Sequence, residues 1–218
     1  MAAIKLKHAS GNGTILNSPA ANPSADVTLK LPSTTGTAGQ VLSVASANHS
    51  ATNAELEFAA VGGKFASYAI IADSKAASSS HGGTFTSGAW RTRDLNTELA
   101  DADGIVSISS NQFTLQAGSY LIRAAAPAYR VNRHLIRLYN ITDSSVAEEG
   151  YGSYSHQNDN SITHTFLSAR ITITGAKAFE IQHRCQSTEA DVGLGLNMSN
   201  NINNTNDIYT IVEIYKES

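Results

Sequence analysis

The sequence is poor in charged residues. They make up 15% of its 218 positions, whereas about 25% is usual for soluble domains. The formal net charge is only −3, and no basic stripe is present to neutralise phosphates, which argues against a nucleic-acid partner. Ser, Thr, Asn, Ala and Gly take the place of the missing charges. Uncharged hydroxyl and amide surfaces are common in β-structured fibres, where long charged side chains would crowd one another.

Cysteine and long apolar runs are also scarce. Cys185 is the single cysteine, so the chain forms no internal disulfide and no thiolate metal cluster. No apolar run approaches the roughly 18 to 20 residues that cross a bilayer, and the first residues lack the apolar core of a signal peptide. We therefore expect no membrane insertion, and assembly in a reducing cytoplasm.

Motifs for catalysis and metal binding are missing as well. The seven histidines never show His-x-x-x-His or His-x-His spacing, and neither a Gly-x-Ser-x-Gly elbow nor a Gly-rich phosphate loop is present. Asp101-Ala-Asp103-Gly104 begins like a calcium loop but has no Glu at the required offset, so it predicts a turn before Ile105. We expect a protein that is not an enzyme and that takes no cofactor and no metal.

Residues 1–62 differ from the rest of the chain in composition and in the length of their apolar runs. They contain three of the four prolines and short alternating apolar runs, each followed by Gly, Asn or Pro. The runs are residues 4–7, 27–31, 41–44 and 56–58. One such strand cannot bury enough apolar surface to offset its ordering entropy. We interpret this region as an extended β-rich shaft and attachment segment that finds its core with copies of itself or on a larger body. Disorder is the alternative.

Residues 63–218 show the pattern of a single β domain. No convincing amphipathic helix is present, and seven or eight strands at spacings of about 10 to 20 residues imply an antiparallel sandwich. Residues 208–215 are apolar on both faces, which predicts a central strand. The other expected strands are residues 65–71, two short pieces within 106–115, and 118–124, 135–141, 161–173 and 179–184.

Two segments carry a family resemblance. In Phe113-Thr-Leu-Gln-Ala-Gly118-Ser-Tyr120-Leu-Ile122, a Gly turn leads into a Tyr-x-aliphatic strand. Arg137-Leu-Tyr-Asn140 is followed by the turn Asp143-Ser-Ser. Both resemble strands of the tumour-necrosis-factor and complement-globular-head jelly roll. The resemblance implies an all-β chain whose residues 63–218 form a jelly-roll head.

The whole chain resembles small tail-fibre and head-fibre proteins of bacteriophages, especially those of marine bacteria. The sequence segments that carry this resemblance begin with Ile4-Lys-Leu-Lys-His, Gly36-Thr-Ala-Gly39-Gln, Gly83-Thr-Phe-Thr-Ser-Gly and Tyr209-Thr-Ile-Val-Glu. Residues 83–96 are the most specific part. The resemblance implies a homotrimer in the virion, assembled in the cytoplasm of the bacterial host and attached to other virion proteins through residues 1–62.

Loops at the far end of such a head are candidates for contact with a host surface. If the first strand rises from the shaft, the distal loops lie around residues 74–83, 129–133, 156–160 and 187–206. Amide groups match sugar hydroxyls, and tyrosine rings stack on pyranose faces. The candidates for contact with a bacterial surface glycan or protein are Tyr129, Tyr151, Tyr154, Asn197, Asn200 and Asn203. Alternatively, the asparagines mark left-handed positions in an exposed loop.

Several residues leave alternatives open. The stretch 124–128, Ala-Ala-Ala-Pro-Ala, allows close approach of a neighbouring subunit about a threefold axis, or packs tightly within one subunit. Arg93 pairs with an acidic residue of a neighbouring subunit, forms an intrachain pair, or stays in solvent. His164 and His183 meet across paired strands or gather as three copies on an axis; the favoured interpretation is hydrogen-bonded structural histidines.

Four functions compete at this point, of which a secreted cytokine-like ligand is disfavoured by the missing export signal and the fibre-like front segment. The leading hypothesis is a trimeric virion fibre whose head binds the host cell surface, since three weak contacts add to useful avidity. The alternative keeps the fold as a capsid decoration or tail connector with a purely structural role. A glycan-degrading enzyme would need acidic residues clustered on adjoining strands, and the sequence shows none.

Overall fold

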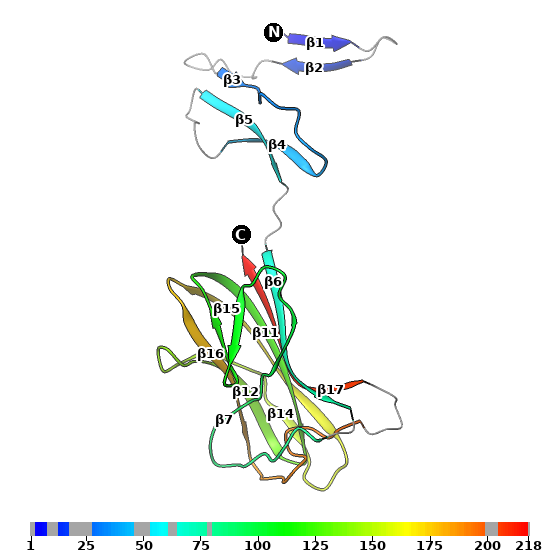
Figure 1. Cartoon of the computed structure of the whole chain (residues 1–218). Helices are drawn as coiled ribbons and strands as arrows, with labels where there is room; N and C mark the ends of the chain where they lie inside the picture. Colours follow the sequence, from blue (N-terminus) through cyan, green and yellow to red (C-terminus); the bar gives the residue numbers. More distant parts are fainter. Residues whose placement is uncertain are drawn as a thin grey trace. The chain divides into compact units, whose positions relative to one another are not determined.

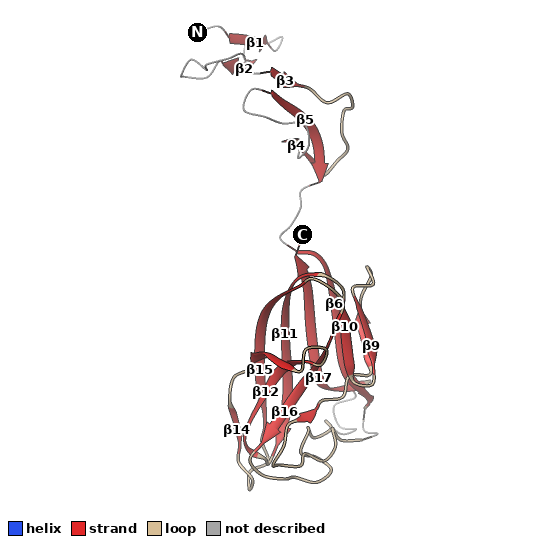
Figure 2. Cartoon of the chain, turned by 90° about the vertical axis from the view of Figure 1, so that its left-hand side faces the viewer, coloured by secondary structure: helices blue, strands red, loops and turns tan. Residues whose placement is uncertain are grey.

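The computed structural model describes residues 3–7, 13–17, 28–45, 53–60, 65–77, 80–198 and 205–217. All regular secondary structure in these ranges is β (Figures 1 and 2). None of the described residues belongs to a helix long and apolar enough to span a membrane. The chain divides into two compact units, residues 1–61 and residues 62–218. We call them the N-terminal unit and the head.

The N-terminal unit contains two small sheets. In the first, an antiparallel pair joins β1 (Ala3–Lys7) to β2 (Gly13–Asn17). In the second, β5 (Asn53–Ala60) lies between a parallel neighbour, β3 (Thr28–Lys30), and an antiparallel one, β4 (Gln40–Val44). Each of the four alternating runs predicted in this region overlaps a strand. Only β2 was missed.

The apolar side chains of β3 and β4 are not covered within this unit. Leu29, Val41, Leu42 and Val44 are all exposed, and Ala45 is the one buried apolar residue among the described side chains of the unit. In an ordinary strand of this kind, period-two alternation turns the apolar side chains to a covered face. Here the described residues of the N-terminal unit supply no such cover.

The segment of residues 36–42 contains the turn that leads into β4 and places this strand beside β5. Gly36 has φ +69°, and a Cβ at this position would lie 2.6 Å from the ring of Phe58. The Gln40 backbone N–H donates to the Thr37 carbonyl at 3.2 Å, and the Gln40 side-chain amide donates to the Phe58 carbonyl at 3.3 Å. Glycine is required at residue 36 because any side chain there would meet the aromatic ring.

The head consists of two antiparallel sheets packed face to face. The five-stranded sheet has the order β15-β11-β17-β6-β8, and its first four strands are labelled in Figure 2. Its strands are β6 (Phe65–Ala76), β8 (Thr97–Ala100), β11 (Gly118–Tyr129), β15 (Ile162–Ile173) and β17 (Asn206–Glu217). The closing strand β17 is third of five, as predicted from its apolar residues on both faces.

The seven-stranded sheet has the order β13-β12-β16-β10-β9, with β14 also paired to β12 and β7 to β16. Its strands are β7 (Arg91–Thr92), β9 (Val106–Ser109), β10 (Gln112–Leu115), β12 (Asn132–Asn140), β13 (Ser145–Glu149), β14 (Ser153–Ser155) and β16 (Lys177–Cys185). From β10 onward, the long strands β11, β12, β15, β16 and β17 alternate between the two sheets. This crossing pattern is a jelly roll, which confirms the predicted fold class of the head.

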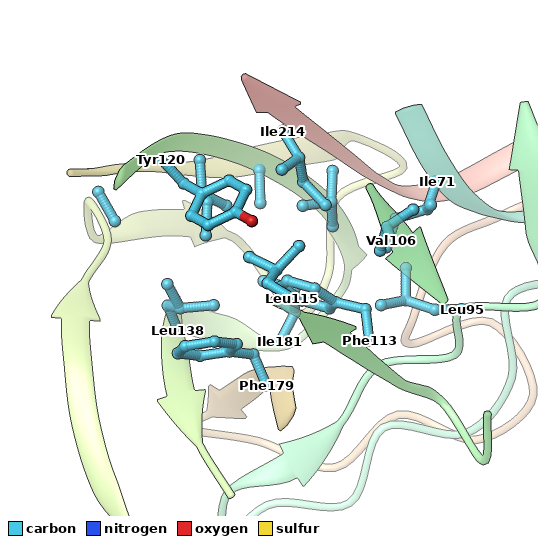
Figure 3. Packing of buried hydrophobic residues seen from close by; sticks show 14 of the residues in the cluster. Ile71, Leu95, Val106, Phe113, Leu115, Tyr120, Leu138, Phe179, Ile181 and Ile214 are labelled. Carbon is cyan, nitrogen blue, oxygen red and sulfur yellow. The ribbon is translucent and has the colours of Figure 1, made fainter. Parts of the chain in front are cut away.

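Alternation along each strand turns one set of side chains toward the other sheet. On β15, Thr165, Leu167 and Ala169 are buried, as their shared face in the sequence predicts. In the core, the rings of Phe113 and Phe179, which pair in register on the neighbouring strands β10 and β16, stack with centroids 5.8 Å apart (Figure 3). Each large apolar side chain buried in this way contributes about 1.5 to 3 kcal/mol relative to exposure.

The turn predicted at residues 101–104 is present. The Asp101 carboxylate accepts the backbone N–H of Ile105 at 2.8 Å and that of Val106 at 2.9 Å. Gly104 occupies the left-handed region with φ +64°. The Asp101 carboxylate therefore caps the loop that leads into β9.

Candidate functional site: an open sheet face and the apical loops

One face of the five-stranded sheet packs on the core, and the described residues of the head leave much of the other face uncovered. We call this second surface the open face. Its central side chains come from β11, β15 and β17, at positions that alternate with the buried ones. They are Leu121, Arg123, Ala125, Phe166, Ser168, Arg170, Ile211, Glu213 and Tyr215. Tyr68 extends the face onto β6, where it pairs in register with Tyr215.

The open face has a charged row between two more apolar rows. Arg123 and Glu213 lie opposite each other on β11 and β17, with Nη1 and Oε2 3.9 Å apart. Two residues along in one direction Ala125 pairs with Ile211, and in the other direction Leu121 pairs with Tyr215. A single weak ion pair of this kind contributes little to stability on a surface.

Large apolar side chains on this face are exposed in the single chain. Tyr68 is 55% exposed and Phe166 is 53% exposed. Phe166 also helps to line a shallow groove of about 560 Å³, together with Leu121, Ala125 and Ile211. Contiguous exposed apolar patches are uncommon on monomers and mark sites of contact.

Tyr151 lies at this groove and not among the apical loops where it was predicted. Its side chain is 73% exposed, and it lines the groove beside Phe166. The Tyr151 backbone N–H donates to the Phe166 carbonyl at 2.7 Å, which holds the residue against β15. The sequence prediction missed this placement because it did not include β13 and β14, two short strands in the connection between β12 and β15.

The alanine-rich stretch of β11 is mostly core. Ala124, Ala126 and Ala128 are buried inside the head, whereas Ala125 is half-buried on the open face. The interpretation as tight packing within one subunit therefore holds for three of the four alanines. Only Ala125 is placed to let another surface approach the sheet.

The predicted distal loops do gather at one end of the head. Phe65 pairs with Glu217 at the opposite end, where β6 begins and β17 ends (Figure 1). At the loop end, the backbone N–H of Gly82 donates to the Gly195 carbonyl at 2.8 Å, and that of Tyr129 to the Gly193 carbonyl at 3.1 Å. The predicted distal position of these loops is therefore correct for their described residues.

These loops pack closely enough to form a small second core. A Cβ on Gly193 would lie 2.6 Å from the Glu189 carbonyl oxygen, and one on Gly195 would lie 2.5 Å from the Tyr209 ring. Phe85 and Cys185 belong to the apolar cluster beneath them. Burial raises the pKa of the Cys185 thiol to about 11, so it stays protonated and inert at neutral pH.

Tyr129 does not have the free ring that was predicted for sugar stacking. It is only 6% exposed, its hydroxyl donates to Asn160 Oδ1 at 2.9 Å, and the Arg130 guanidinium lies 5.0 Å from its ring centroid. Residue 129 lies on the same side of β11 as Leu121, Arg123 and Ala125 of the open face, so the loops packed around it bury the side chain, and strand alternation does not. Tyr129 supports the apex from within.

The other candidate contact residues have different environments. Tyr154 is 50% exposed, on the seven-stranded sheet, with the His156 ring 6.0 Å away. Asn197 is half-buried, and its backbone N–H donates to His81 Nδ1 at 3.1 Å. Asn200 and Asn203 lie outside the described residues.

Arg93 is a buried structural residue, which corrects the hypothesis of pairing across subunits. Its side chain is 1% exposed. Nε donates to Thr210 Oγ1 at 2.8 Å, and Nη2 donates to the carbonyls of Tyr209 at 2.7 Å and Leu194 at 3.0 Å. Burial lowers the pKa of Arg93 to about 10, against the opposing effect of the Asp73 carboxylate. The guanidinium ties β17 to the apical loop.

His183 pairs with His134 and not with His164. His134 Nδ1 lies 3.0 Å from His183 Nε2, and His134 Nε2 lies 2.9 Å from Thr163 Oγ1. His183 is fully buried, so copies of it cannot gather on an axis. Burial, with a further contribution from Arg93, lowers the pKa of His134 to about 4 and that of His183 well below its usual value. His164 lies on the other sheet.

No family model matches the chain. No curated protein matches it either. Among solved structures, it is similar to the globular domain of zebrafish complement 1qA, at 15% identity over 69% of this chain and 96% of that one, with a TM-score of 0.42. It is also similar to murine APRIL, at 7% identity over 69% of this chain and 98% of that one, with a TM-score of 0.43. The vertex protein P5 of phage PRD1 is similar at 11% identity over 72% of this chain and 100% of that one, with a TM-score of 0.43. The assignment of the jelly roll rests on the strand order and register described above.

Proposed function

We propose that this chain is a structural subunit of a bacteriophage virion fibre, that it assembles as a homotrimer through the open face, and that its head contacts the host cell surface. The observation that carries this proposal is the open face itself, where Tyr68, Leu121, Phe166 and Ile211 form an apolar surface that the described residues of the head leave partly exposed. Burying such a surface in a closed threefold assembly removes it from water without leaving a free edge for further growth.

The N-terminal unit supports the same assembly. Leu29, Val41 and Val44 are exposed on its short strands, and strands of three to eight residues do not form an independently stable sheet without an apolar face to bury. Copies of the unit brought together would cover these side chains mutually. Attachment of this unit to other virion proteins is the second part of the proposed role, and it rests on the phage-fibre resemblance of residues 4–13 and 36–42.

A pair of substitutions tests assembly through the open face. Ile211→Glu places a charge at the centre of the face, so we expect the full chain to become monomeric in sedimentation equilibrium. Val146→Glu is the matched control, because Val146 is an exposed apolar residue on β13 of the other sheet. Loss of assembly in both variants, or in neither, contradicts the proposed interface.

Contact with the host surface is supported by the position of the apical loops, at the opposite end of the head from Phe65, where the N-terminal unit connects. Fluorescently labelled full-length protein should bind a restricted set of strains in a panel of marine bacteria and compete with phage adsorption. Binding to no strain would leave the purely structural role, as a decoration or connector, as the better account. The proposed role is non-enzymatic, and release of oligosaccharide fragments from a bound polysaccharide would contradict it.

A further inference from the structure

We propose that a groove on the outer face of the seven-stranded sheet binds a saccharide carrying a carboxylate or phosphate group. This basic groove is formed where β12, β14 and the end of β16 lie side by side, and it has a volume of about 560 Å³. The side chains that matter for binding are Arg133, Leu135, Tyr154, Arg184 and Gln186. The inference rests on the proposed contact with a cell surface and names the chemistry of the ligand.

The fold brings these side chains together through strand register. Arg133 pairs with Tyr154 across β12 and β14, and Leu135 pairs with Arg184 across β12 and β16. The backbone N–H of Gln186 donates to the Arg133 carbonyl at 2.8 Å. The residues between them, such as His134, turn into the core, so the outward positions form one continuous surface.

The groove is positively charged in a protein whose net charge is negative. Arg133 and Arg184 are both exposed, and none of the residues that line the groove is acidic. Arg133 Nη1 donates to Gln186 Oε1 at 3.0 Å. The Arg184 side chain makes no hydrogen bond or ion pair with any described residue. A guanidinium free of partners is suited to bidentate contact with a carboxylate or phosphate.

An aromatic ring borders the two arginines. Tyr154 is half-exposed, and its hydroxyl has no hydrogen-bond partner among the described residues. An exposed tyrosine beside hydrogen-bonding groups offers an apolar face for a pyranose ring and a polar tip for its hydroxyls. Leu135, half-buried, supplies an apolar floor. A charged group and a stacking platform at one place are the two features that an acidic sugar requires.

The size of the groove favours a sugar over an acidic peptide. Its two register positions on β12, residues 133 and 135, span about 7 Å of strand. This length accommodates one or two sugar rings, whereas an extended peptide held by so short a track makes few contacts. The volume lies within the range usual for small-ligand sites. An acidic peptide is therefore the disfavoured ligand, and the experiment includes it.

Gly152 provides a clean way to block the groove. It lines the groove, a Cβ at this position would have no heavy atom within 4 Å, and its φ is not in the left-handed region. A side chain at residue 152 therefore adds to the groove without disturbing the fold. Gly152→Glu introduces a carboxylate that repels an anionic ligand, and Gly152→Gln has nearly the same shape without the charge.

The test is isothermal titration of the full-length protein with trigalacturonic acid and with mannose 6-phosphate, which separate the carboxylate from the phosphate source. Neutral galactotriose, mannose and a polyglutamate peptide are the comparison ligands. We expect binding of at least one anionic sugar, weakened at least tenfold by Gly152→Glu and by Arg184→Gln. Gly152→Gln should bind within about threefold of the parent protein. Circular dichroism melting checks that each variant is folded.

Three outcomes overturn the inference: no binding of either anionic sugar, equal binding by the Glu and Gln variants, or tighter binding of polyglutamate than of the sugars. Binding of whole cells separates this failure from failure of the proposed function. If Gly152→Glu binds cells as well as the parent protein, the basic groove is not the contact site but the head still binds the surface. If the parent protein binds no cells, the proposed surface role itself fails.

Discussion

At the scale of single residues, burial decided roles that sequence spacing left open. Arg93, Tyr129 and His183 are polar side chains that the sequence offered for contact between molecules, and all three are buried within the chain. Arg93 follows the two-residue strand β7 and Tyr129 ends β11, so packing of the loops decides their burial, whereas His183 shares the inward face of β16 with Phe179 and Ile181. For His183 the available signal was this shared face; its partner His134 lies at an inward position of β12, one residue before the run 135–141 that was predicted as a strand.

Replacing Arg93 should lower the free energy of unfolding more than replacing any exposed arginine. Arg93→Lys keeps the charge but loses the planar fork that reaches Thr210, Tyr209 and Leu194. A buried charge without its partners costs about 3 to 5 kcal/mol, and we expect a loss of that order in urea denaturation. Arg91→Lys, an exposed neighbour, should change stability by less than about 0.5 kcal/mol. Equal effects at the two positions would contradict the buried role.

The buried histidine pair should make the head less stable in acid. Burial keeps the native-state pKa values of His134 and His183 below the unfolded value of 6.5, so the unfolded chain takes up protons first as the pH falls. The free energy of unfolding should therefore be flat above about pH 7 and decline between about pH 6.5 and about pH 4.

His134→Gln tests this assignment. The variant removes one titrating group, so its stability should fall less between about pH 7.5 and about pH 5, as measured by urea denaturation at both values. Asp73 has a pKa raised by burial, which gives the opposite slope in acid, but it is common to both proteins and drops out of the comparison. An unchanged slope would show that His134 is not responsible.

At the scale of secondary-structure elements, long strands were predictable and short ones were not. The predicted runs within β11, β15 and β16 alternate over six or more residues, which is enough to reveal one covered face, and the run within β17 is apolar on both faces. β7, β8, β13 and β14 have two to five residues each, mostly polar, and pair at or near sheet edges. Their existence depends on neighbours far along the chain, which no local pattern records. The basic groove was missed because β14 supplies one side of it.

The turn between β9 and β10 shows how an element can be tested. Ser110 and Asn111 have φ values of 53° and 64°, as a two-residue hairpin turn requires. Asn111 Oδ1 also accepts the Leu95 backbone N–H at 3.2 Å, and Nδ2 donates to Asp94 Oδ1 at 3.0 Å. The side chain therefore fixes the segment before β8 onto the hairpin.

Two substitutions separate these contributions in thermal or urea denaturation. Asn111→Gly tolerates the positive φ and loses both hydrogen bonds, so we expect a loss of about 1 to 2 kcal/mol. Asn111→Ala loses the same bonds and adds about 1 kcal/mol of left-handed strain. If the alanine variant is no less stable than the glycine variant, the backbone geometry is not what constrains this position.

At the scale of the whole molecule, the sequence predicted a jelly roll with distal loops at one end, and the strand order confirms it. It did not predict which surface stays uncovered. In the sequence, Leu121, Phe166 and Ile211 cannot be told from core residues, because they are also apolar residues of alternating strands. Which of the two faces of the sheet is covered depends on where the other sheet packs. Only the register of the strands shows that these side chains form one patch.

Truncation should locate the determinants of assembly. Because the open face lies within residues 62–218, a chain shortened to these residues should keep three times its own mass in solution. We expect its assembly to dissociate at lower concentration than that of the full chain, since the exposed strands of the N-terminal unit add contacts. Sedimentation equilibrium over a concentration series measures both. A strictly monomeric head would assign assembly to the N-terminal unit instead.

The most direct test of this account is the mass of the intact particle by native mass spectrometry. A homotrimer predicts about 69 kDa, three times the chain mass of 23.0 kDa, with no appreciable population of single chains at micromolar concentration. A particle of 23.0 kDa would mean that the open face is left to water, and the proposed fibre assembly would be wrong.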